Sequence, residues 1–172
     1  DGSNGLAVGD GVIKTTDGGQ IWNSVATGFL AYLSSAHFID TRTGWAVGQY
    51  GTILKTTDGG ATWTAQSSGS PNHLSGAALF ENRMVWAVGN DGVVLKTTDG
   101  GATWVEQSTG TQAPLFSIRF VNAQNGWVVG GSGTILKTTD GGANWNAQPS
   151  GTIQSLWSVY FVDSQTGWVV GD

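Results

Sequence analysis

Four aspartates combine a reactive side chain with regular spacing. Each lies in the hexapeptide Lys-Thr-Thr-Asp-Gly-Gly, and they recur every 41 residues, at Asp17, Asp58, Asp99 and Asp140. Carboxylates can act as general acids and bases or as metal ligands. Catalysis needs a single site, however, whereas these aspartates occupy the same context in every repeat, and the alternating Asp and Asn ligands of an EF-hand are missing. A short carboxylate can instead accept N–H bonds from the residues that follow it, so we expect these four to fold turns.

The other groups suited to catalysis are few and scattered. Cysteine is absent, which excludes a disulfide framework, a thiolate metal site and a thiol nucleophile. The two histidines, His37 and His73, have no neighbours at the spacing of metal ligands or of a nucleophile elbow. We therefore expect neither enzyme activity nor a bound metal or cofactor.

Composition and charge narrow the choice of partners. The chain carries a formal net charge of −5 and only 7 Lys and Arg, which argues against nucleic acid or an anionic membrane as a partner. No apolar run approaches the roughly 18–20 residues of a membrane span, so we expect no membrane insertion. The abundance of Gly, Ser, Thr, Asn and Trp, with few Lys and Glu, favours a secreted or extracytoplasmic protein. A start at Asp1 without Met indicates a processed product or a fragment.

Tryptophan and lysine follow the same 41-residue period. One tryptophan series closes each Asp-containing motif, at Trp22, Trp63, Trp104 and Trp145, and a second lies in Trp-(Ala/Val)-Val-Gly, at Trp45, Trp86, Trp127 and Trp168. Repeated indoles could be platforms for sugar stacking, but their large apolar area makes core packing the favoured interpretation. For the lysines, at Lys14, Lys55, Lys96 and Lys137, we expect stems along the sheet and ammonium groups in water, and a cation–π contact with the tryptophan that closes the Asp-containing motif stays open.

Each repeat reads as four short strands. In one unit these are Leu33–Ile39, Trp45–Val47, Thr52–Thr56 and Thr62–Gln66, separated by turns rich in Gly and Asp. Connections of two to five residues are typical of antiparallel hairpins, and four strands in roughly 40 residues are typical of a propeller blade. The sequence therefore predicts an all-β fold, a β-propeller of four-stranded antiparallel blades.

The repeat also predicts how the chain divides. We expect a single propeller, or a segment of one, with three whole blades between two partial ones: residues 1–29 (the last three strands of a blade), 30–70, 71–111, 112–152 and 153–172 (the first two strands). The first strand of the C-terminal segment could complete the N-terminal blade in the same chain or in another copy. We favour an assembly through exchanged terminal strands, or a fragment, over a four-bladed monomer.

The combined motif carries a resemblance to known propellers. Thr-Thr-Asp-Gly-Gly-Ala-Thr-Trp resembles the Asp box, or BNR repeat, and the whole segment Gly44–Trp63 is similar to propellers of the photosystem II assembly and stability factor type. This resemblance implies a propeller that binds proteins and has no enzymatic activity. Plant and cyanobacterial members are associated with an arginine-rich surface patch, whereas this sequence contains three arginines.

Two other functions stay open beside protein binding: a glycan-binding propeller and a sialidase-like glycoside hydrolase. A sialidase clamps a carboxylate with three arginines and pairs a Tyr nucleophile with Glu. The chain offers the residue types at Arg42, Arg83, Arg119, Glu81, Glu106, Tyr32, Tyr50 and Tyr160. Because Arg42 and Arg83 occupy the same turn in successive repeats, nothing in the sequence brings this set to one centre.

A binding site is expected where the repeats differ from one another. The connections into each first strand vary most, and one register within that strand varies too: His37, Ala78, Arg119 and Tyr160. Drift at unconstrained positions would give the same variation. In these first strands we expect Phe116, Ile118 and Phe120 to share an apolar face opposite Arg119. The predicted partner-binding rim therefore consists of Tyr32, His37, His73, Arg119 and Tyr160.

Overall fold

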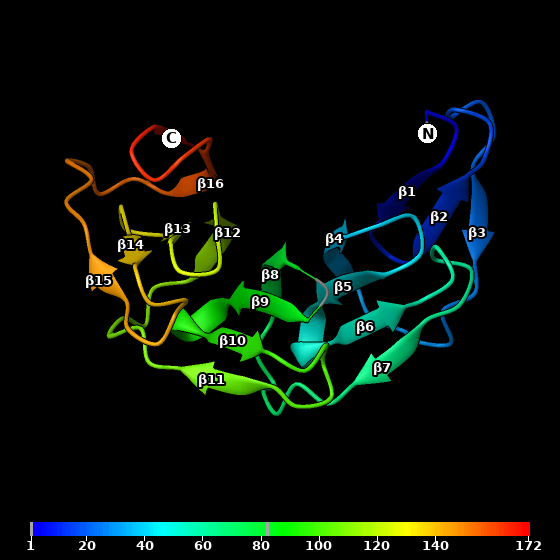
Figure 1. Ribbon diagram of the computed structural model, residues 1–172, viewed down its shortest axis with the longest axis horizontal. Helices are drawn as coiled ribbons and strands as arrows, with labels where there is room; N and C mark the ends of the chain where they lie inside the picture. Colours follow the sequence, from blue (N-terminus) through cyan, green and yellow to red (C-terminus); the bar gives the residue numbers. More distant parts are fainter. Residues whose placement is uncertain (1, 82) are drawn as a thin grey trace.

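The computed structural model describes residues 2–81 and 83–172 and has an all-β architecture. Its strands form five antiparallel sheets that follow one another along an arc (Figure 1). The three central sheets each have four strands: β4 (Leu33–Phe38), β5 (Gly44–Gly48), β6 (Ile53–Thr56) and β7 (Thr64–Gln66); β8 (Leu74–Phe80), β9 (Met84–Gly89), β10 (Val94–Thr97) and β11 (Val105–Gln107); β12 (Leu115–Phe120), β13 (Gly126–Gly130), β14 (Ile135–Thr138) and β15 (Asn146–Ala147). These are propeller blades, as the sequence predicts.

Incomplete sheets stand at both ends of the arc. The N-terminal sheet contains β1 (Gly5–Val8), β2 (Val12–Thr15) and β3 (Asn23–Val25), and the C-terminal sheet contains β16 (Leu156–Phe161) and β17 (Gly167–Gly171). Two short 3-10 turns, η1 (Gln49–Gly51) and η2 (Asn90–Gly92), join strands within blades. None of the described helices is long and apolar enough to cross a membrane.

The first strand of each blade faces the inside of the arc. Figure 1 shows β4, β8, β12 and β16 around the concave side, whereas β3, β7, β11 and β15 lie at the periphery. The strands β4, β8, β12 and β16 also contact one another in succession. Side chains from four separate repeats therefore meet on one concave surface.

Indoles fill the interfaces between blades. Trp86 is fully buried, and its ring stacks on Phe120 of the next blade with centroids 3.8 Å apart. Trp127 stacks on Phe161 in the same way at 3.7 Å. The expectation of a uniform tryptophan core is wrong at the two ends, where Trp22 is 43% and Trp168 is 58% exposed. Within the described chain, no further blade packs on those faces.

A β-bulge interrupts the alternation in every inner strand. The pairing of β12 with β13 shifts register between Leu115 and Ser117, and the same shift recurs in β4, β8 and β16. Such a bulge changes which side chains share a face. As a result Leu115 is buried together with Ile118, whereas Phe116 is only half-buried, which corrects the prediction that Phe116 belongs to the core face.

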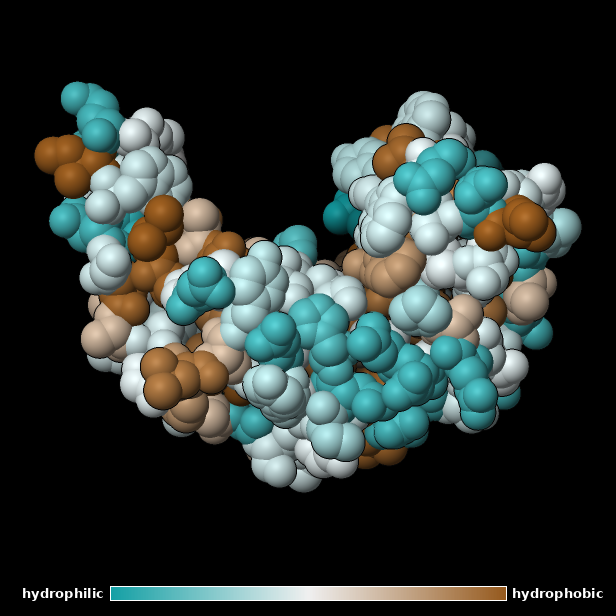
Figure 2. Space-filling view, turned by 180° about the vertical axis from the view of Figure 1, so that it is seen from behind, coloured by the Kyte–Doolittle hydropathy of each residue, from teal (hydrophilic) through white to brown (hydrophobic). Residues whose placement is uncertain are grey.

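The arc is open between its two ends. Among the described residues, β16 and β17 pair only with each other, and β1 pairs only with β2. The space-filling view from behind shows a hollow that opens between the first and last sheets (Figure 2). Completion of the N-terminal blade by β16, in this chain or in another copy, stays a prediction.

Candidate functional site

Hydrogen bonds within each turn engage the repeated aspartates. In the second blade, Asp58 Oδ1 accepts bonds from the Thr56 hydroxyl at 2.8 Å and from the Thr62 backbone N–H at 2.9 Å. The Thr62 hydroxyl donates to Oδ2 at 2.6 Å. The two following glycines have φ of +73° and +81°, a region that disfavours other residues. Both carboxylate oxygens are therefore used inside the turn.

These bonds also keep the carboxylates ionised. The Thr62 hydroxyl and backbone N–H lower the pKa of Asp58 well below its usual range. The side chain and backbone N–H of Asn144 lower the pKa of Asp140 to about 2. The four aspartates belong to four separate turns, and the described residues contain no group of three or more His, Cys, Asp or Glu that could hold a metal ion. This geometry offers no general acid at neutral pH.

The repeated lysines link neighbouring blades. Lys55 Nζ donates to the carbonyl oxygen of Gly100 in the next blade at 2.8 Å and lies 5.0 Å from the ring centroid of Trp45. Lys96 makes the same bond to Gly141 at 2.8 Å. The ammonium groups of Lys55 and Lys96 therefore bind protein oxygens, contrary to the expectation that they lie in water. The ring contacts are to the Trp45 and Trp86 series and not to the tryptophans that close the Asp-containing motifs. Partial burial, opposed by the charge of Asp140, lowers the pKa of Lys96.

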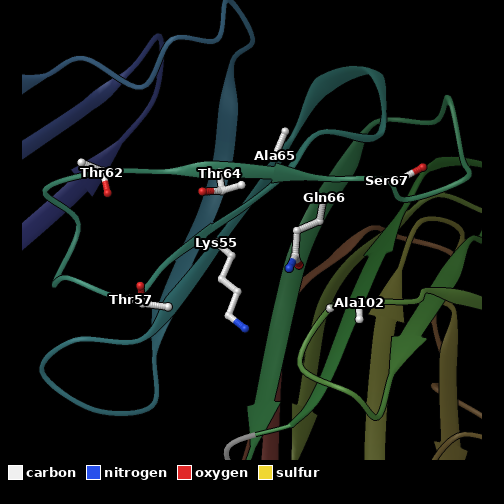
Figure 3. Close-up of a pocket in the computed structure, with 9 residues that line it drawn as sticks. Lys55, Thr57, Thr62, Thr64, Ala65, Gln66, Ser67 and Ala102 are labelled. Atoms are coloured by element: carbon white, nitrogen blue, oxygen red, sulfur yellow. The ribbon is translucent and has the colours of Figure 1, made fainter.

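A polar groove of about 430 Å³ lies where these lysines cross between blades (Figure 3). Figure 3 shows Lys55 and Gln66 pointing toward the loop that carries Ala102. Both side chains already have partners, since Gln66 Oε1 accepts a bond from the Trp45 indole at 3.1 Å and Lys55 binds the box carbonyl. The Lys55 and Gln66 side chains in this groove are therefore engaged in the joint between blades.

A second hollow, of about 540 Å³, spans the concave surface formed by the four inner strands. Three residues of the predicted rim line it, namely His37 on β4, Arg119 on β12 and Tyr160 on β16. Ser34, Ser75, Ser117 and Ser158 add hydroxyl groups to its wall. We refer to this hollow as the concave site.

The other two predicted rim residues lie outside the lining of the concave site. Tyr32 precedes β4 and is exposed, and its backbone carbonyl accepts a bond from the Gln49 N–H. His73 precedes β8, with Nε2 3.2 Å from the hydroxyl of Ser34, which does line the site. His73 is therefore linked to the edge of the concave site, whereas Tyr32 is not brought to it.

The centre of the concave site holds a cation against an aromatic ring. Arg119 Cζ lies 4.9 Å from the ring centroid of Tyr160, and Tyr160 is 53% exposed. Arg119 Nε is buried and has no hydrogen-bond partner among the described residues. Desolvation, together with repulsion from Arg119, lowers the pKa of His37 from its ordinary value of 6.5. The imidazole is accordingly neutral at neutral pH.

Sequence reasoning missed the aromatic wall of this site. Phe116 and Trp157 stack with centroids 4.6 Å apart and an interplanar angle of 21°, and both line the hollow. The Trp157 indole donates to Asp172 Oδ1 at 3.0 Å. The available signal was variation at one repeat position, where Phe116 and Trp157 correspond to Ser34 and Ser75 in the other blades.

One protein family matches most of the chain. The family described as Photosynthesis system II assembly factor YCF48 matches residues 15–114 and again residues 107–172. No curated protein matches the chain.

Solved structures share the fold at low sequence identity. YCF48 from Cyanidioschyzon merolae superposes with a TM-score of 0.76 and 17% identity over 98% of this chain, which spans 62% of that structure. A structure of YCF48 bound to D1 peptide gives a TM-score of 0.55 and 18% identity, covering 99% of this chain and 87% of that one. A GH74 enzyme from Niastella koreensis gives a TM-score of 0.73 and 20% identity, covering 88% and 28% of the respective chains.

Proposed function

Because the chain belongs to the photosystem II assembly factor YCF48 family, we propose that it is a non-catalytic propeller that binds segments of partner proteins on its concave surface. The observation that carries this proposal is the concave site itself, where His37, Arg119 and Tyr160 lie together. These side chains differ from blade to blade, although the residues that build the blades repeat. Positions released from a structural role are the ones available for recognition.

The shape and chemistry of the concave site favour a peptide segment. The site is lined by residues of β4, β8, β12 and β16 and combines aromatic rings, hydroxyl groups and one guanidinium. Aromatic residues and Arg are enriched where proteins bind one another. One structural neighbour is bound to a D1 peptide, which makes a peptide a reasonable ligand class for this chain as well.

Two features support a binding role over catalysis. The box carboxylates accept hydrogen bonds inside their own turns, and in Asp58 both carboxylate oxygens do so. Within the concave site, the described lining residues include no Asp or Glu that could act as an acid or nucleophile.

We also propose an extracytoplasmic location, which fractionation of the native source would test.

Selection of peptides from a displayed random library tests the proposal. The wild-type chain should yield peptides that lose at least tenfold in affinity when Tyr32, His37, Arg119 and Tyr160 are replaced together by Ala. A matched control, Thr64→Ala on the outer strand β7, should leave their binding unchanged. Peptides that bind both variants equally would place recognition outside the concave surface, and selection without any binder would remove the proposal.

A glycan ligand is the second candidate, because Trp157 and Tyr160 are each about half exposed on the concave surface. A glycan array separates the two functions. Binding to a defined sugar that Trp157→Ala abolishes would favour the lectin-like function, whereas an empty array beside selected peptides would favour protein binding.

A further inference from the structure

Arg119 carries a charge that the protein does not neutralise. No Asp or Glu is among the described residues that line the concave site, and Arg119 Nε is buried without a hydrogen-bond partner. Among the other cations, Lys55 and Lys96 donate to box carbonyls, and Arg42 Nε donates to the Thr57 carbonyl at 3.3 Å. Leaving a buried donor without an acceptor costs free energy, and a ligand with an acceptor oxygen would remove that cost.

The scaffold itself has no need of this arginine. The equivalent positions in the other blades hold His37, Ala78 and Tyr160, and the inner strands there pair in the same register. A contact with the ring of Tyr160 orients the guanidinium within the hollow but leaves its donors free to bind an oxygen ligand. The charge of Arg119 is therefore best explained by a ligand that binds in the concave site.

The neighbouring residues restrict what that ligand can be. The Phe116–Trp157 stack forms an apolar wall in the same hollow, and Trp157 is 51% exposed. A ligand that contacts both the wall and Arg119 needs an apolar group and an anionic oxygen pair a short distance apart. Arg binds a carboxylate through two parallel N–H bonds, which gives both strength and orientation.

We propose that Arg119 binds a carboxylate of the partner peptide while an adjacent apolar residue of that peptide packs on Phe116 and Trp157. This inference rests on the proposed peptide-binding function and adds the chemical feature that is recognised. The carboxylate can be a C-terminus or an Asp or Glu side chain. Asp172 stands near the wall, because its carboxylate accepts the Trp157 indole N–H, and it opposes an incoming negative charge.

Small probes test this without a known partner. N-acetyl-phenylalanine presents a terminal carboxylate beside a ring, and acetyl-Asp-Phe-amide presents a side-chain carboxylate. Acetyl-Phe-amide and acetyl-Asn-Phe-amide are their neutral counterparts. NMR titration follows the Nε–H signals of the three arginines and the indole N–H of Trp157. Arg119→Gln assigns the relevant signal, and Arg83→Gln is the control that removes an exposed arginine elsewhere.

We expect at least one acid to shift the Arg119 Nε–H and Trp157 indole signals while its neutral counterpart does not. The acid that binds identifies the source of the carboxylate. Arg119→Gln should weaken that binding about tenfold or more, as expected for a lost charge-assisted bond, and Arg83→Gln should leave it intact. Asp172→Asn should tighten it.

The inference is overturned if neither acid shifts these signals up to its solubility limit, or if acid and neutral probe act equally. Its failure can be told from that of the proposed function. Selected peptides that bind the concave site, and keep their affinity after amidation, after Asp and Glu are replaced, and with Arg119→Gln, would leave the function standing and remove the role of Arg119. Lack of any peptide binding would remove the function itself.

Discussion

At the scale of single residues, the box carboxylates stabilise their turns only while they are ionised. The Thr56 hydroxyl and the hydroxyl and backbone N–H of Thr62 all donate to Asp58, and Asp99 has the same arrangement. Asp140 accepts from the side chain and backbone N–H of Asn144, and Asp17 accepts backbone N–H bonds from Gln20 and Ile21. The folded-state pKa of each box aspartate lies below its ordinary value of 3.8, because hydrogen bonding favours the charged form. Stability from these bonds is therefore present above about pH 4 and lost as pH falls.

This argument predicts a pH-dependent effect of Asp140→Asn. The substitution should lower the urea midpoint at pH 6, because Asn offers one carbonyl oxygen in place of two charged ones. The difference from wild type should shrink as pH falls toward 2, since the pKa of Asp140 in the folded protein is about 2. Urea unfolding followed by tryptophan fluorescence from pH 6 to pH 2 measures it.

Glu106→Gln on the exposed face of β11 serves as the control for this pH series. A difference between wild type and Asp140→Asn that stays constant across the whole range would contradict the stabilising role of the ionised carboxylate.

Among single residues, the sequence revealed which ones recur but not always what they contact. The aspartates were expected to accept N–H bonds from the residues that follow, and such local partners lie within four positions in the chain. The lysines were misjudged because their acceptor, for example Gly100 for Lys55, lies 45 residues away in the next blade. Contacts across a repeat boundary follow from the packing of blades, which a single repeat does not display.

At the scale of strands and blades, stacked aromatic pairs join the last three sheets, with Trp86 on Phe120 and Trp127 on Phe161. Trp86 lies on Phe120 and also donates its indole N–H to the Gly141 carbonyl at 3.1 Å. Trp168 occupies the same repeat position but is 58% exposed. The two indoles are thus alike in sequence context and opposite in environment.

Replacing each of these two tryptophans with alanine should reveal the difference in their environments. Trp86→Ala should destabilise the fold by about 3–5 kcal/mol, as for a buried aromatic residue, whereas Trp168→Ala should change stability by no more than about 1 kcal/mol. Chemical denaturation of both variants measures the difference. Equal losses would show that the face of Trp168 is covered in solution, and the open end of the arc would then be wrong.

Strand positions were predictable because Gly, Asp and Asn punctuate every run, and strands such as β4 and β6 lie within one residue of the expected bounds. The bulge in each inner strand was not predictable by counting alternate residues. It moved Phe116 from the expected core face to the concave site, where its ring stacks on Trp157. Arg119 and Tyr160 of the predicted rim line the concave site beside Phe116 and Trp157, and the role of the rim in binding stays a prediction.

At the scale of the whole molecule, we expect local stability to fall from the central blades to the two ends of the arc. Each blade is stabilised by its own sheet and by its neighbours, as in other repeat proteins. The sheet of β8–β11 has a blade on both sides, whereas β1–β3 and β16–β17 each have one neighbour within the described chain (Figure 1). The ends should therefore open first.

Native-state hydrogen exchange tests this order. Amides of β9 and β10 should exchange slowest, and those of β1, β3 and β17 should be protected at least tenfold less, which corresponds to roughly 1.4 kcal/mol. Uniform protection along the chain would contradict an open arc and would indicate that the terminal sheets are completed in solution.

The central claim is that the inner strands bind a peptide, and photocrosslinking tests it most directly. A peptide selected against the chain is made with benzoylphenylalanine at one position and irradiated in the complex, and the modified residues are located by mass spectrometry. We predict attachment to β4, β8, β12 or β16, with loss of attachment when Arg119 and Trp157 are both replaced by Ala. Attachment confined to the outer strands β7 and β11 or to the box turns would contradict the account.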